Sequence, residues 1–342
     1  MIEIMDTTLR DGEQTSGVSF TEVEKLNIAK FLLREVKVDR IEVASARVSN
    51  GELKSVKRIT EWAGKKGYLD RVEVLGFIDG NKSIDWIREA GGRVVNLLCK
   101  GSRRHVEIQL GKTLEEHLKD IREVIDYASQ FGMDINVYLE DWSNGMKDSP
   151  DYVFALIDAL GKENIKRIML PDTLGVLNPD RTEEYCRQVI NRFPELSFDF
   201  HAHNDYGLAI GNCLAAIKAG IKGIHTTVNG LGERAGNAEL AVTVVNIHDH
   251  LGIKTGINEE KLYEISSLVE RFSGERVPAN LPVVGGNVFT QVSGVHADGD
   301  NKGNLYFNDL LPERFGRTRQ YALGKTSGKA SIKKNLEHLG IQ

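Results

Sequence analysis

His201 and His203 are separated by one residue at the end of an apolar run with the composition of a β-strand. Side chains two residues apart on a strand project from the same face, so both imidazoles can reach one point. Two neutral imidazoles and one carboxylate make a three-ligand site for a divalent cation. We expect Asp11, which ends the first strand-like run, to supply that carboxylate. The alternative is that the histidines only satisfy polar groups at the rim of the sheet.

His248 and His250 have the same spacing but fall at the end of a helical pattern. Residues two apart on a helix point to different sides, so we expect this pair on a solvated face. The strand context, and not the spacing alone, therefore singles out the first pair.

Arg10 directly precedes Asp11, and Gly12 allows the chain to turn there. A guanidinium beside a metal-bound ketone stabilises the negative charge that grows on the oxygen during nucleophilic attack. The alternative is a structural ion pair between Arg10 and Glu13 or Glu42.

Two glycine-rich stretches lie further along the chain. Residues 229–236 contain a Gly-x-Gly, but they follow a strand without opening a βαβ unit, which disfavours a dinucleotide site. We expect these glycines to let the backbone approach a ligand closely. In the second stretch His296 is close to Asp298 and Asp300, so it is a candidate general base, with an ordinary loop histidine as the alternative.

The elements that must position these groups alternate between short apolar runs and longer amphipathic stretches, of which Thr21–Val36 and Leu114–Phe131 are examples. Eight such units in about 250 residues predict a TIM (β/α)₈ barrel, with an open doubly wound sheet as the alternative. We expect the barrel in residues 1–275 and a linker with a small, mostly helical C-terminal subdomain in residues 276–342. The predicted strands are Ile2–Leu9, Arg40–Ala46, Val72–Ile78, Val94–Cys99, Ile135–Glu140, Arg167–Leu170, Ser197–His203 and Gly223–Val228.

Composition indicates an ordinary globular protein of 342 residues with a net charge of −5. Nothing in this balance suggests a nucleic-acid or membrane-surface partner. The three cysteines are far apart, as expected for reduced thiols. The first residues are too polar for a signal peptide and no apolar window is long enough to span a membrane, so we expect a cytoplasmic protein.

The motifs DTTLRDGEQ, HAHND, NGLGERAGN and GVHADG together resemble the DRE-TIM metallolyase superfamily, in particular its Claisen-condensing isopropylmalate, homocitrate and citramalate synthases. The similarity runs from Met1 to beyond Lys334. It implies a TIM barrel followed by small subdomains, a homodimer that exchanges its C-terminal parts, and acetyl-CoA as co-substrate. Members often end in a regulatory domain, which we do not expect within these residues. Acyl-CoA lyases of the superfamily carry a cysteine in the loop that here reads NGLGERAGN. This loop has no cysteine, which disfavours retro-Claisen cleavage as the reaction.

The resemblance also implies roles for single residues. Asp11, His201 and His203 would hold Zn²⁺, Mn²⁺ or Mg²⁺, and Asn237 would complete or support that shell. Arg10 would polarise the 2-oxo group, Thr173 would bind the substrate carboxylate and Glu140 would position the substrate. From the partner subunit, His296 would act as acid and base with Asp298 and Tyr306, and Asn304 would lie on the CoA side.

Leu75, Leu98 and Tyr138 stand near the ends of predicted strands and would line the substrate pocket. They resemble the residues that narrow the pocket of citramalate synthases around pyruvate, and they would leave a second carboxylate unpaired. We therefore expect pyruvate as substrate and (R)-citramalate as product, in branched-chain amino-acid biosynthesis. The alternatives are 2-oxoisovalerate, as in 2-isopropylmalate synthase, and residues that only pack the barrel.

Overall fold

Eight parallel strands close into a barrel in the computed structural model, which describes residues 2–338, 340 and 341. The strands are neighbours in chain order, and β1 pairs with β8 to complete the circle. The predicted TIM barrel is confirmed. The alternative of an open sheet is wrong, because the pairing of β1 with β8 leaves no edge strand in the barrel sheet. The strands are β1 (Glu3–Asp6), β2 (Arg40–Ser45), β3 (Val72–Phe77), β4 (Val94–Lys100), β5 (Asp134–Glu140), β6 (Arg167–Asp172), β7 (Phe198–Ala202) and β8 (Gly223–Thr226).

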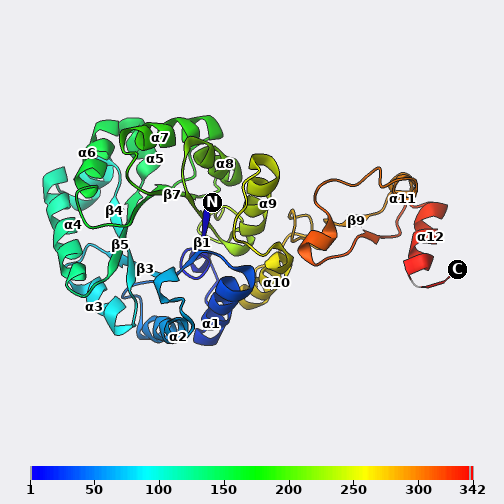
Figure 1. Cartoon of the computed structure of the whole chain (residues 1–342), viewed down its shortest axis with the longest axis horizontal. Helices are drawn as coiled ribbons and strands as arrows, with labels where there is room; N and C mark the ends of the chain where they lie inside the picture. The colour runs from blue at the N-terminus through cyan, green and yellow to red at the C-terminus, as the bar shows by residue number, and fades with distance from the viewer. Residues whose placement is uncertain (1, 339, 342) are drawn as a thin grey trace.

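Helices surround the barrel on its outside (Figure 1). No helix in the described part of the chain is long and apolar enough to cross a membrane. The helices are α1 (Glu22–Phe31), α2 (Asn50–Lys66), α3 (Lys82–Glu89), α4 (Leu114–Ser129), α5 (Trp142–Asp148), α6 (Pro150–Leu160), α7 (Pro179–Arg192), α8 (Ala209–Ala219), α9 (Leu240–Leu251) and α10 (Leu262–Ser273), with π-helical turns η2 (Leu32–Val36) and η4 (His105–Leu110).

Several helices begin where the sequence provides a cap. Thr21 accepts a hydrogen bond from the Glu24 N–H while the Glu24 carboxylate accepts one from the Thr21 N–H, and Thr113 and Glu116 repeat this arrangement. These capping boxes satisfy backbone donors that would otherwise have no partner. The predicted helix Thr21–Val36 is thus present as α1 followed by η2.

Five of the predicted strands, β1, β2, β3, β7 and β8, run one to three residues too far at their carboxyl ends, whereas β5 ends as predicted and β4 and β6 extend one and two residues beyond the prediction. β1 ends at Asp6 instead of Leu9, because Asp6 Oδ1 accepts the Thr8 N–H and the chain turns there. β7 ends at Ala202, and His203 forms an isolated bridge with Asn237. The residues that follow these strands, such as Thr7, Leu9 and His203, are buried like strand residues although the strands have ended.

The barrel interior is layered. Arg40, Glu73 and Asp199 form a buried ionic layer, in which Arg40 contacts both carboxylates. A separate apolar cluster of Met5, Leu75, Tyr138 and Met169 also lies in the barrel interior. The main core fills the space between strands and helices.

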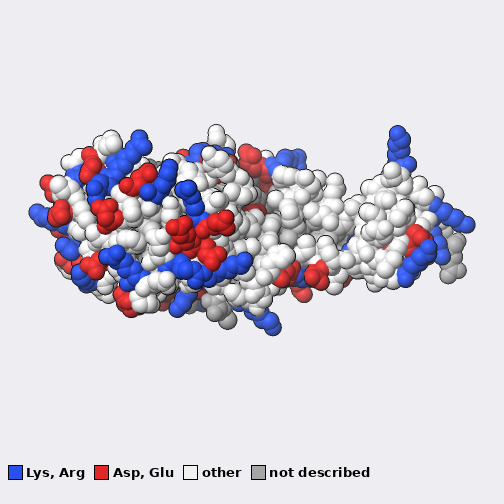
Figure 2. Space-filling view, turned by 90° about the horizontal axis from the view of Figure 1, so that it is seen from above, with Lys and Arg blue, Asp and Glu red and all other residues white. Residues whose placement is uncertain are grey.

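The C-terminal part extends away from the barrel on the side of α9 and α10 (Figure 1). Its elements are β9 (Thr290–Gln291), α11 (Gly294–Asn301), β10 (Gln320–Tyr321) and α12 (Lys329–His338), which agrees with the predicted, mostly helical subdomain. Arg314 anchors this part to the barrel through ion pairs with Asp249 and Glu259. Figure 2 shows acidic and basic residues intermixed over the barrel and a largely uncharged surface over the connection. The boundary at residue 275 stays a prediction.

Candidate active site

Asp11, His201 and His203 meet at the carboxyl end of the barrel. Their potential ligand atoms all lie within 4.8 Å of one another. His201 Nε2 is 3.1 Å from Asp11 Oδ2, and the Nε2 atoms of the two histidines are 3.3 Å apart. Two ring nitrogens and a carboxylate oxygen thus converge on one point, as the spacing of the histidines predicted.

The donor set of this cluster fits a divalent cation. Both carboxylate oxygens of Asp11 are buried and have no hydrogen-bond partner among the described residues, and the same holds for Asn237 Oδ1. A buried carboxylate without a partner is strongly destabilising unless it is paired or coordinates a metal. Oxygen and imidazole ligands with open positions suit several divalent metals, so the residues fit the group without selecting one.

The electrostatics keep these groups in their ligand forms. Burial alone would raise the pKa of Asp11, but the Arg10 guanidinium and the two imidazoles lower this pKa well below its usual range. Burial, helped by the neighbouring His201, lowers the pKa of His203 to about 4, and burial likewise lowers the pKa of His201. An anionic carboxylate and neutral imidazoles are the forms that bind a cation.

Asn237 reaches the cluster through a loop that folds back on itself. Its Nδ2 donates to the Leu231 carbonyl over 2.9 Å, and its backbone bridges to His203. Gly232 and Gly236 have positive φ; a Cβ at Gly236 would lie 1.9 Å from the Gly230 carbonyl oxygen, and one at Gly232 would lie 2.2 Å from Asn237 Nδ2. We expected these glycines to admit a ligand, but the close approach at both is within the loop itself.

A cavity of about 200 Å³ opens beside the metal-ligand cluster. Both polar and apolar side chains line it, a combination that suits a small ligand with one charged end. The structure brings all six predicted substrate-pocket residues of the barrel to this cavity. Among its lining residues are Arg10, Glu140, Thr173, His201, His203, Leu75, Phe77, Leu98 and Tyr138.

Arg10 makes the ion pair with Glu42 that the sequence offered as an alternative, and it also lines the cavity. Its Nε donates to Glu42 Oε2 over 2.5 Å, and Asn96 Nδ2 holds the other Glu42 oxygen over 2.7 Å. This ion pair uses one edge of the guanidinium and fixes its plane. Because Arg10 also lines the cavity, its terminal nitrogens remain for a ligand.

Lys100 is a residue that the sequence reasoning missed. Its Nζ forms an ion pair with Glu140, the predicted substrate-positioning carboxylate. Lys100 also lines a second hollow of about 230 Å³, which shares Phe77 and Leu98 with the first. The sequence could have indicated this residue, because Lys100 is a charged residue at the carboxyl end of a buried strand, where the active sites of such barrels lie.

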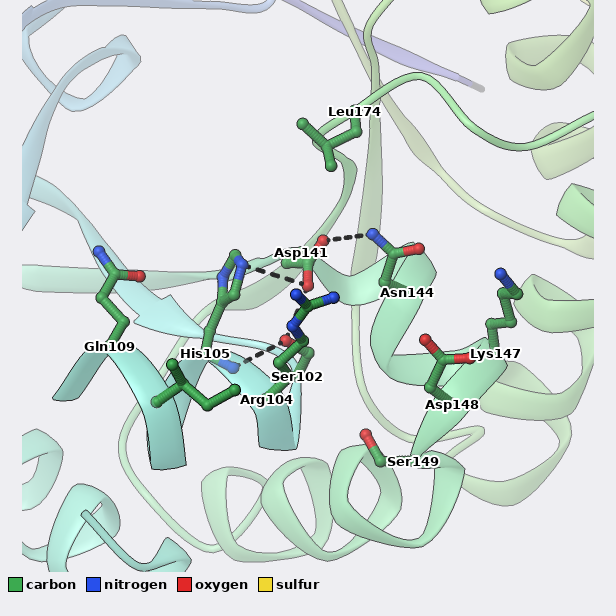
Figure 3. Close-up of a pocket in the computed structure, with 11 residues that line it drawn as sticks. Ser102, Arg104, His105, Gln109, Asp141, Asn144, Lys147, Asp148, Ser149 and Leu174 are labelled. Atoms are coloured by element: carbon green, nitrogen blue, oxygen red, sulfur yellow. Dashed lines mark hydrogen bonds and ion pairs between the residues drawn. The ribbon is translucent and has the colours of Figure 1, made fainter. Parts of the chain in front are cut away.

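Thr173 is held from the side by Asp141. The Asp141 N–H donates to Thr173 Oγ1 over 2.8 Å, which directs the hydroxyl hydrogen elsewhere. Asp141 has a φ of 64°, and Figure 3 shows its carboxylate at the centre of an adjoining hollow, in contact with Asn144 and His105. Ser102 donates to the same carboxylate over 2.8 Å. This network therefore links the end of β5, which carries Glu140, to Thr173 directly after β6.

His296, Asp298, Tyr306 and Asn304 lie in the C-terminal extension, which Figure 1 shows apart from the barrel of the same chain. The ring of His296 stacks on Tyr306 with centroids 4.1 Å apart. The Asp298 carboxylate pairs with Lys302, 2.6 Å away, and not with His296. Within one chain, the extension therefore does not complete the cavity.

The second histidine pair differs partly from expectation. His250 is exposed, as predicted. His248 is half-buried, and its Nδ1 lies 2.5 Å from Glu259 while its Nε2 accepts the Thr255 N–H. His248 faces the loop after α9 while His250 faces solvent, because residues two apart on a helix point in different directions.

Comparison with known families divides the chain in two. Residues 1–269 match the HMGL-like family, and residues 283–342 match the homocitrate synthase post-HMGL domain-like family. A putative (R)-citramalate synthase of Methanopyrus kandleri is 39% identical over 99% of this chain and 65% of its own length. A probable 2-isopropylmalate synthase of Ignicoccus hospitalis is 36% identical over 99% of this chain and 83% of its own length. A homocitrate synthase of Sulfolobus acidocaldarius is 35% identical, with 100% and 72% covered.

Solved structures support the barrel. The HMG-CoA lyase of Bacillus subtilis superposes with a TM-score of 0.69 and 24% identity, over 81% of this chain and 95% of that one. At this identity the likeness concerns the fold alone. The chain spans 65% of the length of the Methanopyrus relative, so that protein has a further part outside the match.

Proposed function

Because the chain belongs to the HMGL-like family, in the Claisen-condensing branch of the DRE-TIM metallolyases, we propose that it condenses acetyl-CoA with a small 2-oxo acid. The observation that carries this proposal is the cavity beside the cluster of Asp11, His201 and His203, which is lined by both histidines, by Arg10 and by an apolar wall. Such a cavity suits a molecule with a carboxylate and ketone at one end and a short alkyl group at the other.

The polar residues would have separate roles in polarising the ketone and in binding the carboxylate of the 2-oxo acid. A divalent cation held by Asp11, His201 and His203, supported by Asn237, would supply Lewis-acid polarisation of the ketone. The terminal nitrogens of Arg10 would stabilise negative charge on the ketone oxygen, in a plane that Glu42 fixes. Thr173 would donate its free hydroxyl hydrogen to the substrate carboxylate, since its oxygen already accepts from Asp141.

We propose pyruvate as the 2-oxo acid and (R)-citramalate as the product. Leu75, Leu98 and Tyr138, together with Phe77, form the apolar wall of a cavity of only about 200 Å³. A second carboxylate, as in 2-oxoglutarate, would lie unpaired against this wall. The second candidate is 2-oxoisovalerate, which has two more methyl groups and is favoured by the 2-isopropylmalate synthases among the relatives.

Acetyl-CoA would enter through the second hollow of about 230 Å³, which Lys100 lines. Because this hollow shares Phe77 and Leu98 with the cavity, it would lie beside the reacting ketone, and Lys112 lines it as well. Apolar walls suit a pantetheine chain and ammonium groups suit its phosphates. Glu140 would be oriented by Lys100 between the two ligands.

His296 of a second copy would remove a proton from the acetyl methyl group. The resulting carbanion would attack the ketone carbon, and the oxygen of the former ketone would take up the proton that His296 removed. Water would then cleave the thioester to release CoA and the hydroxy diacid. The extension holds His296 and Tyr306 away from its own barrel and exposes Val295 and Leu305, which are 67% and 69% accessible. A homodimer in which each extension covers the partner's cavity would bury these apolar side chains. Asp298 and Asn304 would face the same ligands.

Release of CoA thiol tests the proposal directly. The metal-loaded protein is incubated with acetyl-CoA and, in turn, pyruvate, 2-oxobutyrate, 2-oxoisovalerate or 2-oxoglutarate. We expect the highest kcat/KM for pyruvate and a product that is identified as citramalate. A higher value for 2-oxoisovalerate would replace the substrate, and no thiol release with any acid would overturn the reaction. Cleavage of a preformed hydroxyacyl-CoA without condensation would indicate a lyase.

A further inference from the structure

A buried chain of three hydrogen-bonding side chains crosses the barrel interior beside the apolar wall of the cavity. The Tyr138 hydroxyl lies 3.1 Å from His225 Nδ1, and His225 Nε2 lies 3.1 Å from Asp199 Oδ2. All three side chains are buried, and they come from β5, β8 and β7. Tyr138 lines the cavity, whereas His225 and Asp199 do not.

The charges around Asp199 decide which atoms carry hydrogens. Arg40 Nη2 donates to Asp199 Oδ2 over 2.5 Å, and Arg167 Nη1 lies 3.3 Å from the other oxygen. A carboxylate between two guanidiniums accepts hydrogen bonds only. His225 must therefore present its Nε2–H to Asp199, which leaves Nδ1 as an acceptor. The Tyr138 hydroxyl consequently donates to His225.

The hydrogen bond to His225 fixes the position of the Tyr138 hydroxyl, and further contacts hold its ring. The ring packs in the cluster with Met5, Leu75 and Met169, and the Arg10 guanidinium carbon lies 5.8 Å from the ring centroid. Any outward movement of the ring would break the bond to His225 and leave a buried nitrogen without a partner, which is costly. The apolar wall of the cavity is therefore tied to the ionic layer of the barrel interior.

We propose that His225 is a positioning residue that sets the size limit of the 2-oxo acid by holding Tyr138 in place, and that Asp199 acts only by fixing the His225 tautomer that accepts from Tyr138. The inference rests on the proposed function only in the identity of the ligand. A larger alkyl group could enter only if the ring moved, and the hydrogen-bond chain opposes this movement. A carboxylate against this wall would meet a hydroxyl whose hydrogen is already committed to His225.

Two substitutions at one position separate the two hydrogen bonds. In His225→Asn, the amide oxygen can replace Nδ1 and accept from Tyr138. In His225→Gln, the longer side chain can replace Nε2 and donate to Asp199 but does not offer an acceptor at the Nδ1 position. Dissociation constants for pyruvate and 2-oxoisovalerate are measured by calorimetry with the metal-loaded protein in the absence of acetyl-CoA, and kcat/KM is measured for both acids.

We expect His225→Gln to raise the preference for 2-oxoisovalerate over pyruvate by about tenfold, the effect of roughly one methyl group in a fitted pocket. His225→Asn should keep the wild-type ratio. Tyr138→Phe removes the same hydrogen bond, so adding it to His225→Gln should change the ratio little further.

Three results would overturn the inference: equal changes for both acids in His225→Gln, the same ratio shift in His225→Asn, or additive effects with Tyr138→Phe. If the wild-type protein binds 2-oxo acids but releases no CoA, the proposed reaction fails while the binding ratios still decide the role of His225. If it binds none of them, both proposals fail.

Discussion

Lys100 and Glu140 form an ion pair at the mouth of the barrel, where the last residues of β4 and β5 are partners in register. The pair joins the two hollows, since Glu140 lines the cavity near the metal ligands and Lys100 lines its neighbour. Lys100→Met keeps the aliphatic stem but removes the cation that orients Glu140. We expect kcat to fall about tenfold, with little change in the dissociation constant of the 2-oxo acid. Exposed Lys147→Met is the control, and an equal loss of oxo-acid binding in Lys100→Met would contradict the assignment.

Removal of the metal should abolish turnover and lower thermal stability, because the buried Asp11 carboxylate then accepts no hydrogen bond from the described residues and keeps only the Arg10 guanidinium, 3.8 Å away, as a cationic neighbour. Asp11→Asn should weaken metal binding by more than about 100-fold, and Asn237→Ala by roughly 10- to 100-fold as a supporting residue. Metal content and calorimetric titration with Mn²⁺ or Zn²⁺ measure both effects. His250→Ala changes an exposed histidine of the other pair and should bind metal normally. Unchanged affinity in Asp11→Asn would remove the basis of the metal site.

Leu98→Ala should enlarge the cavity and shift the substrate preference. We expect the ratio of kcat/KM for 2-oxoisovalerate to that for pyruvate to rise about 10- to 100-fold, because the two acids differ by two methyl groups. The neighbouring Leu97 is fully buried in the outer core. Leu97→Ala should therefore cost about 2–5 kcal/mol of stability while leaving the ratio unchanged. Similar ratios in both variants would mean that Leu98 only packs the barrel.

Mixing of inactive subunits tests the origin of the acid and base group. Arg10→Gln and His296→Ala should each be inactive as pure dimers, although His296→Ala should still bind metal and the 2-oxo acid. In a mixed dimer one cavity combines an intact Arg10 with an intact His296 from the other subunit, so co-expressed chains should regain activity. If the mixture stays inactive although mixed dimers form, His296 does not act across subunits.

His117 should make stability depend on pH. It is fully buried, it accepts the Lys100 N–H over 3.1 Å, and burial lowers its pKa from 6.5 to about 4. Between these values the unfolded chain binds a proton that the folded protein does not, so stability present above pH 6.5 is lost as the pH falls towards 4. The loss is at most about 3 kcal/mol. His117→Gln should flatten this part of the unfolding profile, whereas His250→Gln should not. A profile that is unchanged in His117→Gln would exclude this residue as the cause.

Periodicity along the chain was sufficient to predict the barrel and the residues at its carboxyl ends. His201 and His203 share a face because a strand repeats every two residues. Glu140 ends a buried strand, and Arg10, Asp11 and Thr173 follow buried strands. These relations are local, so they are readable without a structure. The exact strand ends were not readable, because the hydrogen bond of Asp6 that turns the chain lies among residues that are buried like those of a strand.

Closure of the barrel decided the remaining relations, since they join residues that are far apart in the chain. The pairing of Arg10 with Glu42, of Lys100 with Glu140 and of Tyr138 with His225 depends on strand register and on distances across the interior. The path of the C-terminal extension, which takes His296 away from its own barrel, depends on packing between Arg314 and the ends of α9 and η6 (Glu259–Lys261). The types and local spacing of side chains were therefore sufficient to predict the candidate residues, while only three-dimensional packing determined which of them contact and restrain one another.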